Sequence, residues 1–186
     1  MKRWHWRKSI SAAVVIGMLG ALLYAMPSVQ AQNTILLQHG YEDGTTQGWT
    51  GRSTAETLTA APEAARSGAF GLKVADRARG WHGATLDVTE QLEMGKTYVF
   101  TGWVKLPANS PNSRVYMTMQ RTAGGNMFYE QLNYGTASSG SWVQIKAEYK
   151  YREPSDQLSI YFEIPDQPTL SFYLDDFALE RLPDAE

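Results

Sequence analysis

The sequence predicts an all-β fold, a β-sandwich of the jelly-roll type with a concave face suited to binding. Short segments alternate apolar and polar residues with the period of two that a half-buried strand requires. Turn-forming residues separate these segments, and the 186-residue chain contains 10 Tyr, 6 Trp and 16 Gly. No segment shows the longer period of an amphipathic helix of useful length.

Ten segments carry this strand pattern. In the clearest of them, residues 158–164, four apolar side chains share one face, and Ser159, Tyr161 and Glu163 share the other. Two adjacent glycines within residues 122–126 predict a hairpin turn. In chain order the predicted strands are residues 35–37, 56–60, 70–74, 84–88, 97–106, 114–121, 127–134, 142–151, 158–164 and 171–181.

The first 31 residues predict export. Four basic residues precede an uncharged apolar run at residues 10–26, and Val29-Gln30-Ala31 offers small residues where a signal peptidase reads. We expect a signal peptide at 1–31, cleavage after Ala31, a single module at 32–182 and a disordered tail at 183–186. An uncleaved membrane anchor is the alternative, because the apolar run approaches the length of a spanning helix.

Charge and composition exclude some classes of protein. Removing residues 1–31 takes away four basic residues and no acidic ones, which leaves 13 Lys and Arg against 19 Asp and Glu. Without a basic stripe, we expect no nucleic acid as a partner. Because the chain has no cysteine, a disulfide framework is excluded, and the core or a metal must supply stability. We expect a secreted monomer with no membrane contact after signal cleavage.

Three predicted strands present similar polar and aromatic faces. These faces carry Tyr116, Thr118 and Gln120, then Tyr129, Gln131 and Asn133, and finally Tyr161 and Glu163. If the strands lie in one sheet, the faces form a cleft that combines stacking area with paired hydrogen-bonding groups. Such a surface suits a sugar, although any one of these faces alone is also typical of ordinary solvent exposure.

The tryptophans divide into two groups. Trp49, Trp103 and Trp142 are expected in the core, the usual place for this side chain. Trp81 lies between Gly80 and His82-Gly83 and has no apolar neighbours, so a position on the rim of a cleft is as reasonable as burial.

Catalysis has little support in the sequence. A glycosidase needs two carboxylates across the scissile bond, but only Glu163 has a place on the polar face, since Glu130 alternates away from Tyr129. No G-x-S-x-G motif occurs, and His39 and His82 lack the spacing of a metal-binding pair.

A cation site has better support. Phe172 and Leu174 are at even-numbered positions of the strand, whereas Phe177 and Leu179 are at odd-numbered ones. For all four to face the core, the strand must contain a bulge, which we predict at Asp175-Asp176. Two carboxylates at a bulge, with Glu42 and Asp43 as further oxygen donors, favour Ca²⁺ in an exported protein. The alternative is that both aspartates cap turns or face water.

Six segments together resemble carbohydrate-binding module family 22, whose members are attached to xylanases, commonly of glycoside hydrolase family 10. The glycine-flanked Trp49 and Trp81 segments are the more specific of the six. The segments are residues 41–52 (YEDGTTQGWTGR), 67–74 (SGAFGLKV), 80–83 (GWHG), 92–98 (LEMGKTY), 119–122 (MQRT) and 172–177 (FYLDDF).

The resemblance implies a jelly roll that binds xylan in an open cleft and has no catalytic residues. The family's ligand-binding residues match Arg52, Trp81, Tyr129, Tyr161 and Glu163, with Tyr134 as a nearby alternative to Tyr129. We add Gln120 from the polar face. The resemblance also implies a structural calcium ion held by Asp175, with Glu42 as its partner.

We therefore predict a non-catalytic module that binds xylan and xylo-oligosaccharides and directs a secreted xylanase to the plant cell wall. The alternatives are a small jelly-roll glycosidase or lyase and a calcium-stabilised structural or adhesion module.

Overall fold

The computed structural model describes residues 32–184, which fold into two antiparallel β-sheets. The predicted signal peptide and residues 185–186 of the predicted tail lie outside the described residues. The all-β sandwich predicted from the sequence is confirmed. Its strands are β1 Thr34–His39, β2 Thr50–Gly51, β3 Thr57–Ala61, β4 Gly71–Ala75, β5 Gly83–Asp87, β6 Thr97–Lys105, β7 Ser113–Ala123, β8 Asn126–Ala137, β9 Val143–Lys150, β10 Gln157–Glu163 and β11 Phe172–Arg181.

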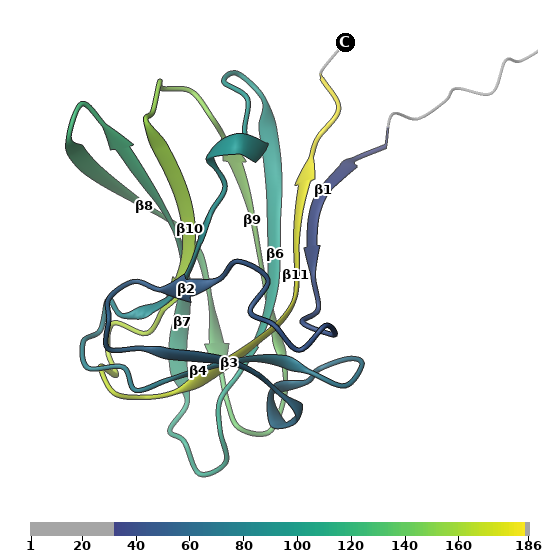
Figure 1. Ribbon diagram of the computed structural model, residues 1–186, viewed down its shortest axis with the longest axis vertical. Helices are drawn as coiled ribbons and strands as arrows, with labels where there is room; N and C mark the ends of the chain where they lie inside the picture. Colours follow the sequence, from purple (N-terminus) through teal and green to yellow (C-terminus); the bar gives the residue numbers. More distant parts are fainter. Residues whose placement is uncertain (1–31, 185–186) are drawn as a thin grey trace, which may run out of the picture. The chain divides into compact units, whose positions relative to one another are not determined.

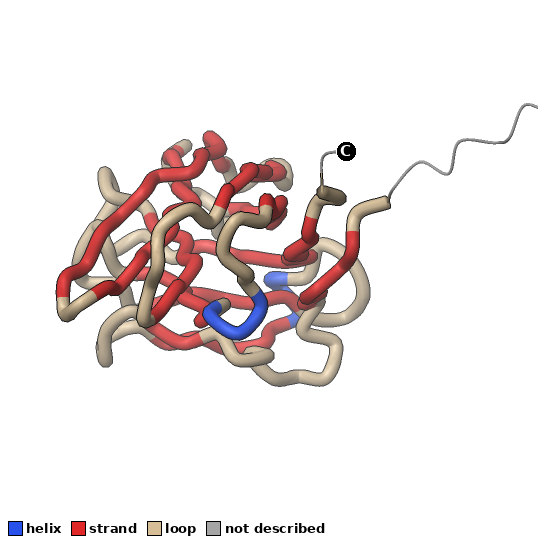
Figure 2. Tube along the Cα trace, turned by 90° about the horizontal axis from the view of Figure 1, so that it is seen from above, coloured by secondary structure: helices blue, strands red, loops and turns tan. Residues whose placement is uncertain are grey.

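The six-stranded sheet has the order β3-β4-β11-β6-β9, and β1 also pairs with β11. The five-stranded sheet has the order β2-β5-β10-β7-β8 (Figure 1). Two short 3₁₀ turns, Pro62–Ala64 and Thr89–Gln91, are the helical segments of the described chain (Figure 2). No helix within residues 32–184 is long and apolar enough to cross a membrane.

Alternation along each strand builds the core between the sheets. On β10, Ile160 and Phe162 are fully buried, and the Phe162 ring lies 5.9 Å from the ring of Trp49. Trp49 in turn packs edge-on against Phe177 of the opposite sheet, with ring centroids 4.9 Å apart. Because one parity of each strand is used for this core, the other parity of the five-stranded sheet points away from it, although Tyr161, Thr118 and Ser159 on that face are covered by neighbouring side chains and are less than 9% exposed.

A bulge in β8 changes the face that its second half presents. Met117 pairs with Asn133, whereas Thr118 pairs with Gln131, so Leu132 is an extra residue on β8. The prediction that Asn133 shares a face with Tyr129 is therefore wrong. Asn133 turns toward β9, where its side-chain amide donates to the carbonyl of Lys146 at 2.7 Å, and Tyr134 takes its place on the solvent face.

The bulge predicted at Asp175-Asp176 is confirmed, because the pairing of β11 with β6 shifts between Asp175 and Ala178. On β6, Trp103 has the outward parity and is only partly buried, with the guanidinium of Arg66 3.7 Å from its ring centroid. Trp142 is also partly buried. The expected core position is thus correct for Trp49, which is 1% exposed, and wrong for Trp103 and Trp142.

Candidate functional site

The candidate site lies on the face of the five-stranded sheet that points away from the core. Strand register arranges its side chains in three rows across β5, β10, β7 and β8. Each row is named here after its β10 residue. The Glu163 row is Gly83, Glu163, Tyr116 and Tyr134; the Tyr161 row is Thr85, Tyr161, Thr118 and Gln131; the Ser159 row is Asp87, Ser159, Gln120 and Tyr129.

Arg52 crosses this face and joins three of the aromatic residues. It follows β2, and its guanidinium lies 3.6 Å from the ring centroid of Tyr161. The same group donates to the carbonyl oxygen of Trp81 and to Oε1 of Gln120, both at 2.9 Å. It lies 5.7 Å from the ring centroid of Tyr129. The site therefore has a cation and aromatic rings in one connected cluster.

A cavity of about 700 Å³ opens beside Arg52. Five of the six predicted ligand-binding residues line it: Arg52, Trp81, Gln120, Tyr129 and Tyr161. Its other lining residues are Gly51, Thr85, Met127, Gln157 and Ser159. Trp81 and Tyr129 are 49% and 56% exposed, so each leaves a large area of aromatic ring free to contact a ligand.

Glu163 is the predicted ligand-binding residue that lies outside this lining. One of its carboxylate oxygens accepts a hydrogen bond from Thr118 at 3.1 Å. Burial raises the pKa of Glu163, and Thr118, Arg52 and Arg77 act to lower it. Burial and the charge of Glu163 raise the pKa of Tyr161 to about 12. The Tyr161 phenol therefore keeps its proton at neutral pH, but its side chain is only 3% exposed.

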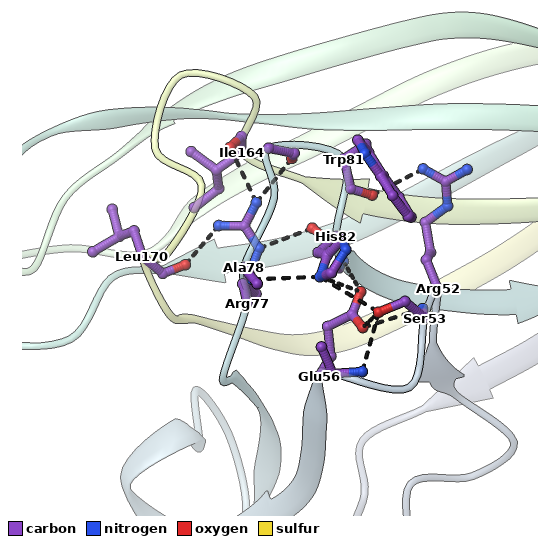
Figure 3. Close-up of polar contacts among 12 residues, drawn as sticks. Arg52, Ser53, Glu56, Arg77, Ala78, Trp81, His82, Ile164 and Leu170 are labelled. Carbon is purple, nitrogen blue, oxygen red and sulfur yellow. Dashed lines mark hydrogen bonds and ion pairs between the residues drawn. The ribbon is translucent and has the colours of Figure 1, made fainter.

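The loop that presents Trp81 is held from below by Arg77, which is only 3% exposed. Its guanidinium donates to the carbonyls of Gly80 and His82 on either side of Trp81 (Figure 3). It also donates to three carbonyls of the segment after β10, those of Ile164, Gln167 and Leu170. One buried cation thus ties the Trp81 loop to the segment that follows Glu163.

A buried carboxylate supports the same loop from the other side. Oxygens of Glu56 accept hydrogen bonds from the backbone N–H of Gly83 and from Ser53, at 3.0 and 2.6 Å, and lie near His82 (Figure 3). Burial acts to raise the pKa of Glu56, but these hydrogen bonds outweigh it and hold the pKa below its usual value. Glu56 therefore remains charged and links the segment after Arg52 to the segment after Trp81.

Sequence reasoning missed two kinds of residue here. Alternation places Ser159 on the face of Tyr161 without marking it as a site residue, and Gln157, which has the same parity, could have been found by the same signal. Arg77 and Glu56 have no such signal, because the contacts that join separate segments are to backbone groups distant in sequence: the carbonyl of Ile164 for Arg77 and the N–H of Gly83 for Glu56. The glycines around Trp81 are needed for close packing: a Cβ at Gly80 or Gly83 would clash with the carbonyl of Pro165 or Phe162.

The predicted calcium ligands face one loop but are already engaged. Asp175 Oδ2 accepts the backbone N–H groups of Arg66 and Ser67, at 2.6 and 3.1 Å. Glu42 accepts those of Ala69 and Phe70, at 2.8 and 3.2 Å. Within residues 32–184, no three acidic or histidine side chains converge on a common point. Because Ca²⁺ takes six to eight oxygen ligands, which include backbone carbonyls and water, Asp175 and Glu42 would supply only part of such a shell, and calcium stays a prediction.

The carboxylates on the site face are too far apart for glycoside hydrolysis. Besides Glu163, the three rows contain one acidic residue, Asp87, which pairs with Ser159. Ser159 and Glu163 are four residues apart on β10, about 13 Å along the strand. Glycosidases hold their carboxylates about 5 to 9.5 Å apart. Glu130 is no substitute, because it pairs with core residue Met119 and so has the parity opposite to Tyr129.

Comparison with known proteins points to one kind of module. The sequence profile of a family described as "Carbohydrate binding domain" matches residues 33–169. The chain is 34% identical over 142 residues to endo-1,4-beta-xylanase A of Thermotoga neapolitana. It is 31% identical over 183 residues to endo-1,4-beta-xylanase C of Paenibacillus barcinonensis. The matches cover 74% and 95% of this chain but only 13% and 16% of those enzymes.

A solved structure gives a match along nearly its whole length. The CBM22-1 xylan-binding domain of Paenibacillus barcinonensis Xyn10C superposes with a TM-score of 0.77 at 30% sequence identity. The match covers 82% of this chain and 97% of that domain. The two proteins therefore share a fold over most of this chain.

Proposed function

We propose that this chain, which belongs to carbohydrate-binding module family 22, binds xylan and xylo-oligosaccharides in the cleft beside Arg52 without cleaving them. The observation that supports this best is the gathering of Trp81, Tyr129, Tyr161 and Arg52 around one cavity of about 700 Å³. Exposed rings beside fixed hydrogen-bonding groups are what a pyranose chain requires, because it has apolar faces and a rim of hydroxyls.

Each side chain has a distinct task in this proposal. Trp81 and Tyr129, which both line the cavity, stack on sugar rings. Arg52 is fixed by Gln120 and by the carbonyl of Trp81, and it donates its remaining N–H groups to hydroxyls. Glu163 accepts hydrogen bonds from hydroxyls, while the ring of Tyr161, which is only 3% exposed, packs against the guanidinium of Arg52 and fixes its position.

The biological role that follows is to keep an enzyme on its insoluble substrate. Since the chain spans less than a fifth of the xylanases it matches, we propose that it serves as one module of such an enzyme and holds it on plant cell wall. A polysaccharide of that size is encountered outside the cell, which agrees with the signal peptide predicted at residues 1–31.

Titration calorimetry of residues 32–186 with xylohexaose and with cellohexaose tests the proposal. We expect binding of xylohexaose with micromolar to millimolar Kd and weaker binding of cellohexaose, whose hydroxymethyl groups need extra room. Binding of neither sugar overturns the proposal. Release of reducing ends from xylan by the pure protein contradicts its non-catalytic part.

Replacing Glu163 by alanine should weaken binding of xylohexaose about 10- to 100-fold. The reason is that a charge-assisted hydrogen bond is worth about 1.5–3 kcal/mol and its loss leaves sugar hydroxyls without an acceptor. Calorimetry of Glu163→Ala measures this, with Glu148→Ala as the control, because Glu148 is exposed on β9 of the other sheet. Equal affinity in both variants would remove Glu163 from the site.

Affinity should fall as the pH is lowered through a range above that of an ordinary glutamate. Burial raises the pKa of Glu163, although Thr118, Arg52, Arg77 and Tyr161 oppose this, and protonation removes a hydroxyl acceptor. Fold stability responds in the opposite direction: the folded state binds this proton more tightly than the unfolded chain, so protonation of Glu163 favours folding. Calorimetric titrations with xylohexaose from pH 7 to 4.5 should show a decline in affinity for the wild type and a flatter affinity profile for Glu163→Gln. A flat profile for the wild type would contradict this prediction.

A further inference from the structure

We propose, resting on the function above, that the sugar site continues past Glu163 into a second section of the same face, with Tyr134 as its aromatic platform. Its ligand is the continuation of the same neutral polysaccharide chain. The starting point is that Glu163 lies outside the lining of the cavity beside Arg52. A chain that contacts both Trp81 and Glu163 must therefore extend beyond that cavity.

Tyr134 and Tyr116 share the Glu163 row, so they lie directly across from that carboxylate. Their ring centroids are 5.3 Å apart with a tilt of 40°. Tyr134 is 47% exposed, and the guanidinium of Arg114 is 5.4 Å from its ring centroid. Packing against Tyr116 limits the movement of the Tyr134 ring, which leaves a fixed and accessible aromatic surface for stacking.

A separate cavity of about 440 Å³ adjoins this pair at the next row of the sheet, where Arg114 pairs with Thr136. Its lining is polar and holds both donors and acceptors, as sugar hydroxyls require: Asn112, Ser113, Arg114, Thr136, Asp166 and Gln167. The wall formed by Gln167 is preformed, because its carbonyl accepts from the buried Arg77 at 2.9 Å and its N–H donates to Ile164. Ligand binding would then cost little ordering of this segment.

The two cavities lie toward opposite ends of the same strands. On β7, Arg114 lines the smaller cavity and Gln120 the larger one, six residues away or about 20 Å along the strand. The Glu163 row occupies the space between them. Strand register thus places Glu163, Tyr116 and Tyr134 between the two cavities, and this distance suits an oligosaccharide of several units better than a short one.

The test compares ligand lengths. Calorimetry of Tyr134→Ala should show about five-fold weaker binding of xylohexaose than wild type, with binding of xylotriose changed less than two-fold, because a trisaccharide occupies the cavity beside Trp81 alone. Tyr173→Ala is the matched control: Tyr173 lies on β11 of the other sheet, where it pairs with Lys105, and its removal should change neither affinity. Melting temperatures of the three proteins verify folding.

The possible results separate this extension from the function on which it rests. Wild-type binding of xylohexaose with no change in Tyr134→Ala overturns the second section alone. Equal losses for xylotriose and xylohexaose also overturn it, because Tyr134 would then belong to the first cavity. Failure of the wild type to bind any xylo-oligosaccharide overturns both proposals.

Discussion

Replacing Trp81 by alanine should weaken xylohexaose binding nearly 100-fold with almost no change in fold stability. The side chain is 49% exposed and lines the cavity beside Arg52. A sugar ring stacked on it would cover about 100 Å² of apolar surface, worth about 2.5 kcal/mol. The variant loses the contact between the Arg52 guanidinium and the Trp81 ring, 5.6 Å from its centroid, but it keeps the hydrogen bond from Arg52 to the backbone carbonyl at position 81.

Calorimetry measures the affinity, and thermal unfolding measures the stability. Trp142→Ala is the matched control: the variant removes the same type of side chain, and Trp142 is partly buried beside Lys105 of β6 and is not among the residues that line the cavity beside Arg52. Its expected outcome is the reverse: reduced stability with unchanged affinity. Should Trp81→Ala bind within two-fold of wild type, stacking at this position does not drive recognition.

Strand alternation predicts much of this site, because the face on which a side chain lies follows from its immediate neighbours in the sequence. The parity of Tyr161 and Glu163 follows from three buried apolar residues on β10 and from Ile164 directly after it, and antiparallel pairing then brings Gln120 and Tyr129 to the same face. The chain changes parity where a bulge inserts a residue. At Asp175 the apolar pattern on both sides reveals that bulge, whereas at Leu132 the residues before and after it are mostly exposed.

Other positions depend on contacts that a linear pattern does not contain. Trp103 is of a residue type that is usually buried in the core, yet β6 places it outward, where Arg66 covers its ring. Arg77 resembles any charged loop residue until its five carbonyl partners are known. Alternation thus locates side chains on strands, while the loops that orient Trp81 can be explained only from tertiary hydrogen bonds.

Replacing Arg77 by methionine should lower both stability and affinity. The change leaves five backbone carbonyls without their donor. A buried carbonyl without a hydrogen-bond partner costs about 1–3 kcal/mol, but some of the five will bind water instead. We therefore expect the free energy of unfolding to fall by about 4 kcal/mol. For a domain of this size that corresponds to a fall in Tm of about 12 °C. Thermal unfolding of Arg77→Met and wild type measures this directly.

The affinity of the folded fraction distinguishes a positioning role from simple support of the fold. Arg77 joins the Trp81 loop to the segment after Glu163, so its loss should release both and weaken xylohexaose binding at least ten-fold, measured well below the Tm. Arg66→Met is the matched control, because Arg66 contacts Trp103 and Asp176 on the other sheet and should cost stability alone. Arg77→Lys keeps three donors and the charge, so it should recover part of the affinity. Unchanged affinity in Arg77→Met would show that Trp81 is held in place without Arg77.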